Sequence, residues 1–194
     1  FELNKEFLQT PEIHVLAEML SVTFIQRQDL YTRQLDDGSY VCVHKPLTEK
    51  HLVAHLIGKM TLGAYLLNAD SQTRLAVIDA DDDLQLARLA NISVSLAQHD
   101  IPSYLESSRR GAHLWFFFEQ PLPGAVVRNF GRSIFKAYAL QGIEFYPKQD
   151  KLEDGPGSLI RLPFGIHRKN GKRYGFVTQN GEPVAKSIAE QIRL

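Results

Sequence analysis

Four aspartates end an apolar segment near the middle of the chain. The stretch LAVIDADDD spans residues 75–83 and holds Asp79, Asp81, Asp82 and Asp83 within five positions. Asp82 and Asp83 stand where a helix would begin, and negative charge stabilises a helix N-terminus. Asp79 lies inside the apolar segment, and side chains two positions apart on a strand share a face. Asp79 and Asp81 therefore form a carboxylate pair of the kind that holds divalent ions in phosphoryl transfer.

Two other kinds of site use closely spaced aspartates, and the neighbouring residues argue against both. A calcium-binding EF-hand loop that starts at Asp79 needs glycine and glutamate where this chain has Leu84 and Ala90. An aspartyl-phosphate phosphatase carries threonine or valine shortly after its D-x-D, at the place of Asp83. The phosphatase therefore stays only as a weaker alternative.

A second motif is a turn rich in hydroxyls and arginines that leads to a histidine. The segment ESSRRGAHLWFFF contains Ser108, Arg109, Arg110, Gly111 and His113. Turn amides, arginine side chains and an imidazole together make a cradle for anions. A histidine on an apolar strand is also typical of a protein core, and the same letters partly match the signature of RNA-recognition modules. The motif by itself leaves these alternatives open.

Two further motifs follow towards the C-terminus. In GIEFYPKQD, Glu144 lies on a short predicted strand and Lys148 follows it. In LIRLPFGIHRKNGKRYGF, Arg161 lies on a predicted strand, and His167 and Lys169 come shortly after it. Each of these residues is compatible with an exposed surface position. The basic residues Arg161, His167 and Lys169 are, as a group, also typical of the edge of a phosphate-binding site.

The elements that carry these residues follow from apolar periodicity. From Leu75 onward the pattern predicts strand, helix, strand, strand, helix, strand, the order of the split βαβ units in ferredoxin-like and RNA-recognition folds. We therefore predict an α+β fold whose antiparallel or mixed sheet forms an RNA-recognition-like catalytic core in residues 68–194. Residues 1–67, with a helix predicted from Pro11 towards Arg33, form an N-terminal α/β module packed on that core, and both together make one domain.

Composition limits the class of protein. The 194 residues contain 22 basic and 22 acidic side chains, so nucleic-acid binding would need a local basic face rather than overall charge. The single cysteine, Cys42, excludes an internal disulfide, which favours a cytoplasmic protein. No apolar run approaches the roughly 20 residues that span a membrane. Because the chain begins with Phe1 rather than methionine, we expect it to be part of a longer protein.

Taken together and in this order, the four motifs resemble the archaeo-eukaryotic primase superfamily, in particular primase-polymerase domains of the TOTE and CRISPR-associated kind. DAD matches the family's D-x-D, SSRRGAH its turn ending in histidine, and IEFYPKQ its third, acidic motif. The segment from Arg161 to Gly171 matches R-x-P-x-x-x-H-x-K-x-G, and the resemblance covers about Phe24 to Phe176. Gly111 and Glu144 depart from the commoner serine and aspartate of the family.

The resemblance implies a template-dependent nucleotidyltransferase, a DNA or RNA primase-polymerase that joins NTPs or dNTPs by two-metal-ion phosphoryl transfer. Asp79, Asp81 and Glu144 would be the catalytic residues and hold two Mg²⁺ or Mn²⁺ ions. The implied nucleotide-binding residues are Ser108, Arg109, Arg110, Gly111, His113, Lys148, Arg161, His167 and Lys169. The implied partners are a single-stranded DNA template with its primer, nucleoside triphosphates, and CRISPR adaptation proteins or further domains of the same chain.

Two alternatives remain from the sequence. A non-catalytic single-stranded nucleic-acid-binding module of RNA-recognition type would share the fold but has no need of the aspartate pair. In the N-terminal part, His51 and His55 are spaced to share a helix face and, with Cys42 and His44, suggest zinc. The Cys-x-His spacing is shorter than in an ordinary zinc knuckle, which disfavours a zinc site.

Overall fold

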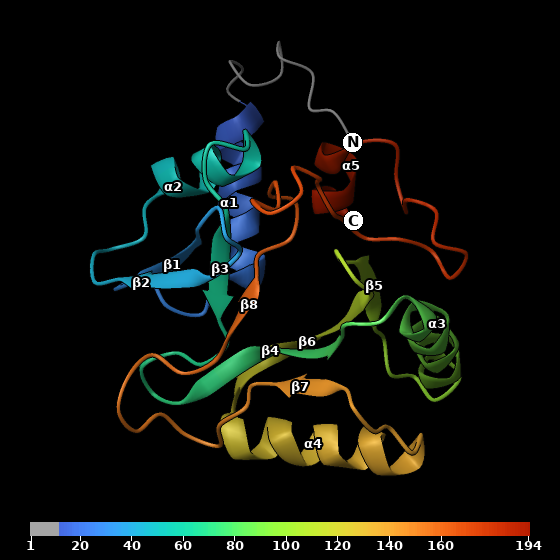
Figure 1. Ribbon diagram of the computed structural model, residues 1–194. Coiled ribbons are helices and arrows are strands. Elements are labelled where there is room, and N and C mark those ends of the chain that lie inside the picture. Colours follow the sequence, from blue (N-terminus) through green and yellow to red (C-terminus); the bar gives the residue numbers. More distant parts are fainter. Residues whose placement is uncertain (1–11) are drawn as a thin grey trace. The chain divides into compact units, whose positions relative to one another are not determined.

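The structure is a computed structural model that describes residues 12–194 (Figure 1). Its helices are α1 (Glu12–Phe24), α2 (Glu49–Leu56), α3 (Asp83–Ala97), α4 (Gly124–Ala137) and α5 (Ile188–Arg193). Its strands are β1 (Tyr31–Gln34), β2 (Tyr40–Val43), β3 (Leu62–Tyr65), β4 (Gln72–Ala80), β5 (Tyr104–Ser107), β6 (Ala112–Pro123), β7 (Glu144–Tyr146) and β8 (Leu159–Arg161). Contacts divide the chain into two compact units, of which the second comprises Leu66–Leu159 and Phe176–Pro183 and the first the rest of the described chain.

The first unit is built on a four-stranded sheet in the order β2-β1-β3-β8. Helix α1 packs against α2 and α5 and buries Leu16 and Leu20 completely. The predicted start of this helix, Pro11, lies outside the described residues. The prediction of helix towards Arg33 was wrong, because the helix ends at Phe24 and Arg33 lies on β1.

The ring of His55 contributes to the core of the first unit. This side chain is fully buried, its Nε2–H donates to the carbonyl of Pro163 over 2.8 Å, and its Nδ1 accepts from the backbone N–H of Leu62 over 3.0 Å. The Nδ1 of His51 likewise accepts from the backbone of Thr48, at the start of α2. Both nitrogens of His55 are therefore used by the fold, and the zinc alternative loses one of its ligands.

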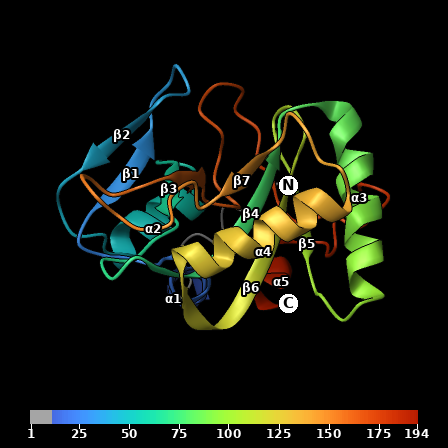
Figure 2. The same ribbon diagram turned by 90° about the horizontal axis from the view of Figure 1, so that it is seen from below.

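The second unit holds the sheet β5-β6-β4-β7, in which every neighbouring pair of strands is antiparallel. Its element order, β4-α3-β5-β6-α4-β7, is the predicted split βαβ order. Helices α3 and α4 pack on one face of this sheet (Figures 1 and 2). The core beneath them includes Ile78, Leu89, Leu114, Phe116 and Ile134. The predicted fold class, α+β with an antiparallel sheet, is confirmed.

Strand register places four polar residues in one row across this sheet. Glu106 on β5 pairs with His113 on β6, His113 with Asp79 on β4, and Asp79 with Glu144 on β7. Paired residues point to the same side, and their sequence neighbours, such as Ile78 and Leu114, belong to the core under the helices. The row therefore lies on the face of the sheet opposite to α3 and α4.

No helix in residues 12–194 is both long and apolar enough to cross a membrane. The predicted N-terminal module, residues 1–67, and the predicted catalytic core, residues 68–194, stay predictions.

Candidate active site

His113 lies between two carboxylates at the centre of the row. Its Nδ1–H donates to Oε2 of Glu106 over 2.7 Å, and its Nε2 lies 3.4 Å from Oδ1 of Asp79. Glu106 is fully buried and His113 is 5% exposed. The ring is therefore buried, as the alternative of a core histidine expected, but its partners are charged, and its predicted role in nucleotide binding stays a prediction.

The two carboxylates keep the imidazole protonated. Burial by itself lowers the pKa of His113, but the negative charges of Glu106 and Asp79 and the hydrogen bond with Glu106 outweigh it and raise the pKa to about 9. At neutral pH the row therefore carries a buried imidazolium between two acids.

Asp79 retains one unsatisfied oxygen. Its Oδ1 is inaccessible to solvent, and the contact with His113 at 3.4 Å lacks the geometry of a hydrogen bond. A buried carboxylate oxygen without a hydrogen bond costs free energy, and the nearest charged group to this one is the imidazolium of His113. This oxygen suits a hard divalent ion.

Glu144 is held by two residues that follow it in the sequence, one on β7 and one just beyond it. Its Oε2 accepts from the hydroxyl of Tyr146 and its Oε1 from Nζ of Lys148, both over 2.8 Å. These two hydrogen bonds lower the pKa of Glu144, whereas the charge of Asp79 opposes the shift. The ammonium group of Lys148 also lies 4.8 Å from the centre of the Tyr146 ring. Glu144 is thus an ionised carboxylate with a cationic partner.

A cavity of about 610 Å³ opens beside Lys148. Its wall comes from Arg128 on α4 and from the loop of residues 149–157, and Nε of Arg128 donates to Asp150 over 2.9 Å. Ligand pockets for small molecules commonly have volumes of about 300–1,000 Å³. The cavity therefore adjoins Lys148, while its other walls come from α4 and the loop and not from the polar row.

The third predicted acid, Asp81, lies just beyond the end of β4 and forms an ion pair with Arg110. Arg110 belongs to the β5–β6 turn, in which the hydroxyl of Ser108 accepts from the backbone N–H of Gly111 over 3.1 Å. A Cβ at Gly111 would lie 2.0 Å from the carbonyl oxygen of Ala80. Glycine is therefore needed because the turn packs directly against the end of β4.

Two further residues of the second unit that the sequence analysis singled out lie in the β5–β6 turn and at the start of α3. Arg109 is half-buried in the same turn and has no ion pair or hydrogen bond among the described residues. Asp82 caps α3, as predicted, by accepting from the N–H of Leu84 over 2.9 Å.

Three predicted nucleotide-binding residues belong to the first unit. Arg161 is 6% exposed, and its guanidinium lies 5.4 Å from the centre of the Tyr174 ring. His167 is also buried, and its Nδ1 accepts from the backbone N–H of Lys169 over 3.2 Å. Lys169 itself is exposed. Their role in nucleotide binding stays a prediction.

The carboxylates fit a divalent ion without forming a finished site. Within residues 12–194, no three histidine, cysteine or acidic side chains gather as ready ligands of one metal ion. Asp81 and Glu144 are instead paired with Arg110 and Lys148, and Asp79 offers a buried oxygen without a hydrogen bond. Oxygen donors of this kind suit Mg²⁺ or Mn²⁺ once those two pairs open.

Sequence reasoning missed Glu106 and Tyr146. Both could have been found from the alternation of side chains along a strand. Glu106 and His113 are each the second strand residue from the turn that joins β5 and β6, so they pair with each other. Tyr146 lies two positions after Glu144, so both side chains lie on the same face of β7.

Comparison with known proteins identifies the family and the fold. The family description of the archaeo-eukaryotic primase domain of the TOTE conflict system matches residues 18–191. The solved structure of the polymerase domain of Mycobacterium tuberculosis Ligase D, in complex with DNA, shares the fold with a TM-score of 0.54 and 10% identity, over 93% of this chain and 84% of that one. No curated protein matches. The chain belongs to the archaeo-eukaryotic primase domains of TOTE conflict systems.

Proposed function

We propose that the protein is a template-dependent nucleotidyltransferase, a primase-polymerase that adds NTPs or dNTPs by two-metal-ion phosphoryl transfer. The observation that carries the proposal is the register of Asp79 with Glu144 on adjacent strands, together with the unbonded buried oxygen of Asp79. Directly paired residues have Cβ atoms about 5 Å apart, so both carboxylates can serve one metal centre. Family membership supports the same activity.

Asp79, Asp81 and Glu144 would hold two Mg²⁺ or Mn²⁺ ions. Bound there, the ions would activate the attacking hydroxyl and neutralise charge on the triphosphate. Arg110 and Lys148 would release Asp81 and Glu144 and donate instead to phosphate oxygens, which are strong acceptors for both. Release therefore converts two structural ion pairs into two phosphate contacts.

The rest of the predicted nucleotide site is part of the same proposal. The imidazolium of His113 would donate from Nε2 to a phosphate. We further propose a role in nucleotide binding for Ser108, Arg109, Gly111, Arg161, His167 and Lys169.

A DNA template and primer are the proposed macromolecular partners. The polymerase domain of Ligase D was solved with DNA, and its likeness to this fold supports a nucleic-acid partner here. The family description names the TOTE conflict system, so further domains of a longer chain are the proposed protein partners, whereas the comparisons give no support to a CRISPR partner.

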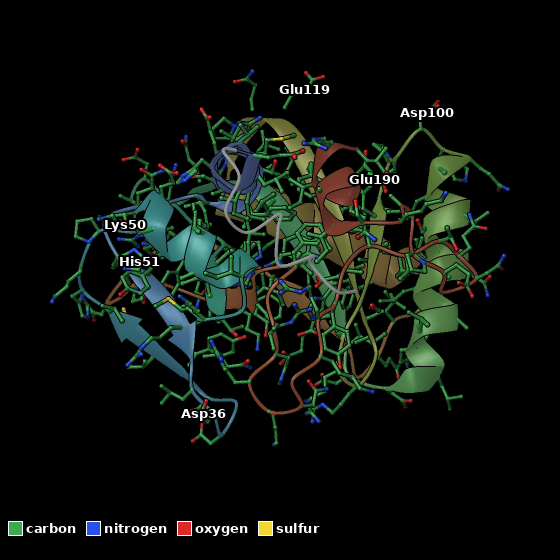
Figure 3. The ribbon with its side chains drawn as sticks, turned by 90° about the horizontal axis from the view of Figure 1, so that it is seen from above. Asp36, Lys50, His51, Asp100, Glu119 and Glu190 are labelled. Carbon is green, nitrogen blue, oxygen red and sulfur yellow. The ribbon has the colours of Figure 1, made fainter. Side chains whose placement is uncertain are left out.

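The test is nucleotide addition with Mg²⁺ and with Mn²⁺, on an unprimed and on a primed single-stranded template. We expect D79N to lose about 1,000-fold or more in rate, because a metal centre contributes several kcal/mol to transition-state stabilisation. D100N is the matched control, since Asp100 is an exposed aspartate just after α3 (Figure 3). It should keep the wild-type rate.

Three results would separate the possibilities. Products on both templates, lost in D79N alone, would support a primase-polymerase, and products on the primed template alone would support a polymerase. Single-strand binding without any incorporation, unchanged in D79N, would instead favour the non-catalytic binding module and refute the proposed activity.

A further inference from the structure

Glu106 is the fully buried member of the polar row, and no role has yet been given to it. A single oxygen, Oε2, accepts from Nδ1–H of His113 over 2.7 Å and from Nε1–H of Trp115 over 2.8 Å. Burying a carboxylate is costly unless it is hydrogen-bonded and paired with a positive charge. An apolar side chain would fill the space at lower cost, so the acid needs a reason beyond packing.

Trp115 fixes the position of the acceptor. The indole is fully buried, and its ring stacks on Phe117 with centroids 6.3 Å apart and an interplanar angle of 14°. Because the indole cannot turn, the oxygen that its N–H binds is held in place as well. Glu106 therefore presents a fixed acceptor to the neighbouring strand.

The fixed acceptor determines how the imidazole of His113 is turned. With Nδ1 bound to Glu106, the opposite nitrogen, Nε2, faces Asp79 at 3.4 Å. A ring without this bond could rotate about its Cβ–Cγ bond and turn Nε2 away from the row. Residues that hold a ligand-contacting histidine through its second nitrogen commonly change activity by about 10–100-fold when replaced.

We propose that Glu106 is a positioning residue that acts through His113, and holds Nε2 towards Asp79 and the phosphates of a bound nucleotide. The proposal rests on the proposed function for its ligand, a nucleoside triphosphate. It adds to that function a residue that touches neither the nucleotide nor the proposed metal ligands.

The test compares E106Q, H113A and the double variant E106Q/H113A. Glutamine keeps an acceptor oxygen and the size of the side chain but removes the charge. The matched control is E119Q, because Glu119 is an exposed acid on the same sheet, on β6, and points into solvent (Figure 3). The readouts are affinity for a non-hydrolysable nucleoside triphosphate with Mn²⁺, kcat and KM of single-nucleotide addition, and the indole N–H signal in NMR spectra. Trp115 is the only tryptophan in the sequence, so this signal reports one hydrogen bond.

We expect E106Q to keep one shifted indole signal, which shows a folded protein, while triphosphate affinity and kcat/KM fall by about 10–100-fold. In the double variant the loss should equal that of H113A alone, because a residue that acts through His113 has nothing left to act on. E119Q should match the wild type in every readout.

Triphosphate affinity and kcat/KM unchanged in E106Q, or losses that add in the double variant, would overturn the positioning role and leave the proposed function intact. A wild-type protein that neither binds nor adds nucleotides would overturn the proposed function, and this role with it. If E106Q does not fold, W115F takes its place, since it removes the anchor of Glu106 but keeps its charge. An unchanged triphosphate affinity in W115F would then refute the role.

Discussion

At the scale of single residues, His113 carries a buried charge between Glu106 and Asp79. The pKa of His113 is about 9 in the folded chain, against a usual value near 6.5 for an exposed histidine. A raised pKa means that the folded state binds the proton more tightly than the unfolded state does. The resulting stabilisation is complete below about pH 6.5 and disappears as the pH rises through 9.

We therefore expect the metal-free protein to lose up to about 3 kcal/mol of unfolding free energy between pH 6.5 and 10 because of this group. Denaturant unfolding in the presence of a chelator, at several values of pH, measures the loss. H113Q has no imidazole to titrate and should show a much flatter profile. An equal decline in H113Q would assign the effect to other groups.

A second prediction at this scale concerns Tyr146, whose hydroxyl donates to Glu144 over 2.8 Å. Y146F removes that donor, so the Glu144 carboxylate should be less well oriented and its pKa less lowered. We expect the Mn²⁺ concentration for half-maximal nucleotide addition to rise about tenfold. Y138F is the control, because the hydroxyl of Tyr138 donates to Ser95 instead. Equal metal dependence in both variants would contradict an orienting role for Tyr146.

At the scale of elements, β7 is the shortest strand of the sheet that holds the polar row, with three residues, and it carries Glu144. The side chain of Phe145 anchors it to α4, where a Cβ at Gly131 would lie 2.6 Å from two atoms of the ring. Phe135 adds an edge-on contact to the same ring, with centroids 6.1 Å apart. The glycine in the middle of α4 therefore makes room for the residue that holds β7.

We predict that G131A destabilises the protein, although alanine favours a helix over glycine by about 1 kcal/mol. Overpacking against Phe145 should cost about 1–3 kcal/mol and displace Glu144, so the rate of nucleotide addition should fall as well. Chemical denaturation and single-nucleotide addition measure both effects. F145L in the G131A background should recover part of the stability, because the smaller side chain leaves space for the new methyl group. An increase in stability in G131A alone would refute this account of β7.

The elements also show which features of the fold could be predicted from the sequence. The split βαβ order and the cap at Asp82 were predictable because they depend on local periodicity and local hydrogen bonds. The pairing of Glu144 with Asp79 was not, because it joins strands 65 positions apart whose register nothing local specifies. Likewise, the partners of Asp81 and Glu144 depend on side-chain placement, so Arg110 and Lys148 were predicted to bind phosphate but not to hold the acids.

At the scale of the whole molecule, a contact over a long sequence distance closes the first unit. His55 donates to Pro163 across 108 positions, and Leu62 accepts from the N–H of Leu162 beside it. Motif spacing identifies Arg161, His167 and Lys169 as a group but does not reveal that β8 belongs to the sheet of β1, β2 and β3. The pairing of strands that are far apart in the sequence depends on which apolar side chains the folded chain buries together, and motif spacing does not contain that information.

The order of the two units along the chain has a consequence for dissection of this protein. The described chain alternates between them, since Leu66–Leu159 and Phe176–Pro183 form one unit while Ile160–Gly175 and Val184–Leu194 return to the other. No uninterrupted fragment contains one unit whole without part of the other. A truncation at residue 159 would remove most of β8 from the first unit and Val177, whose N–H donates to Leu105, from the second. Gene fusion or shuffling can therefore move the polar row together with Arg161, His167 and Lys169 only as one interleaved stretch of chain.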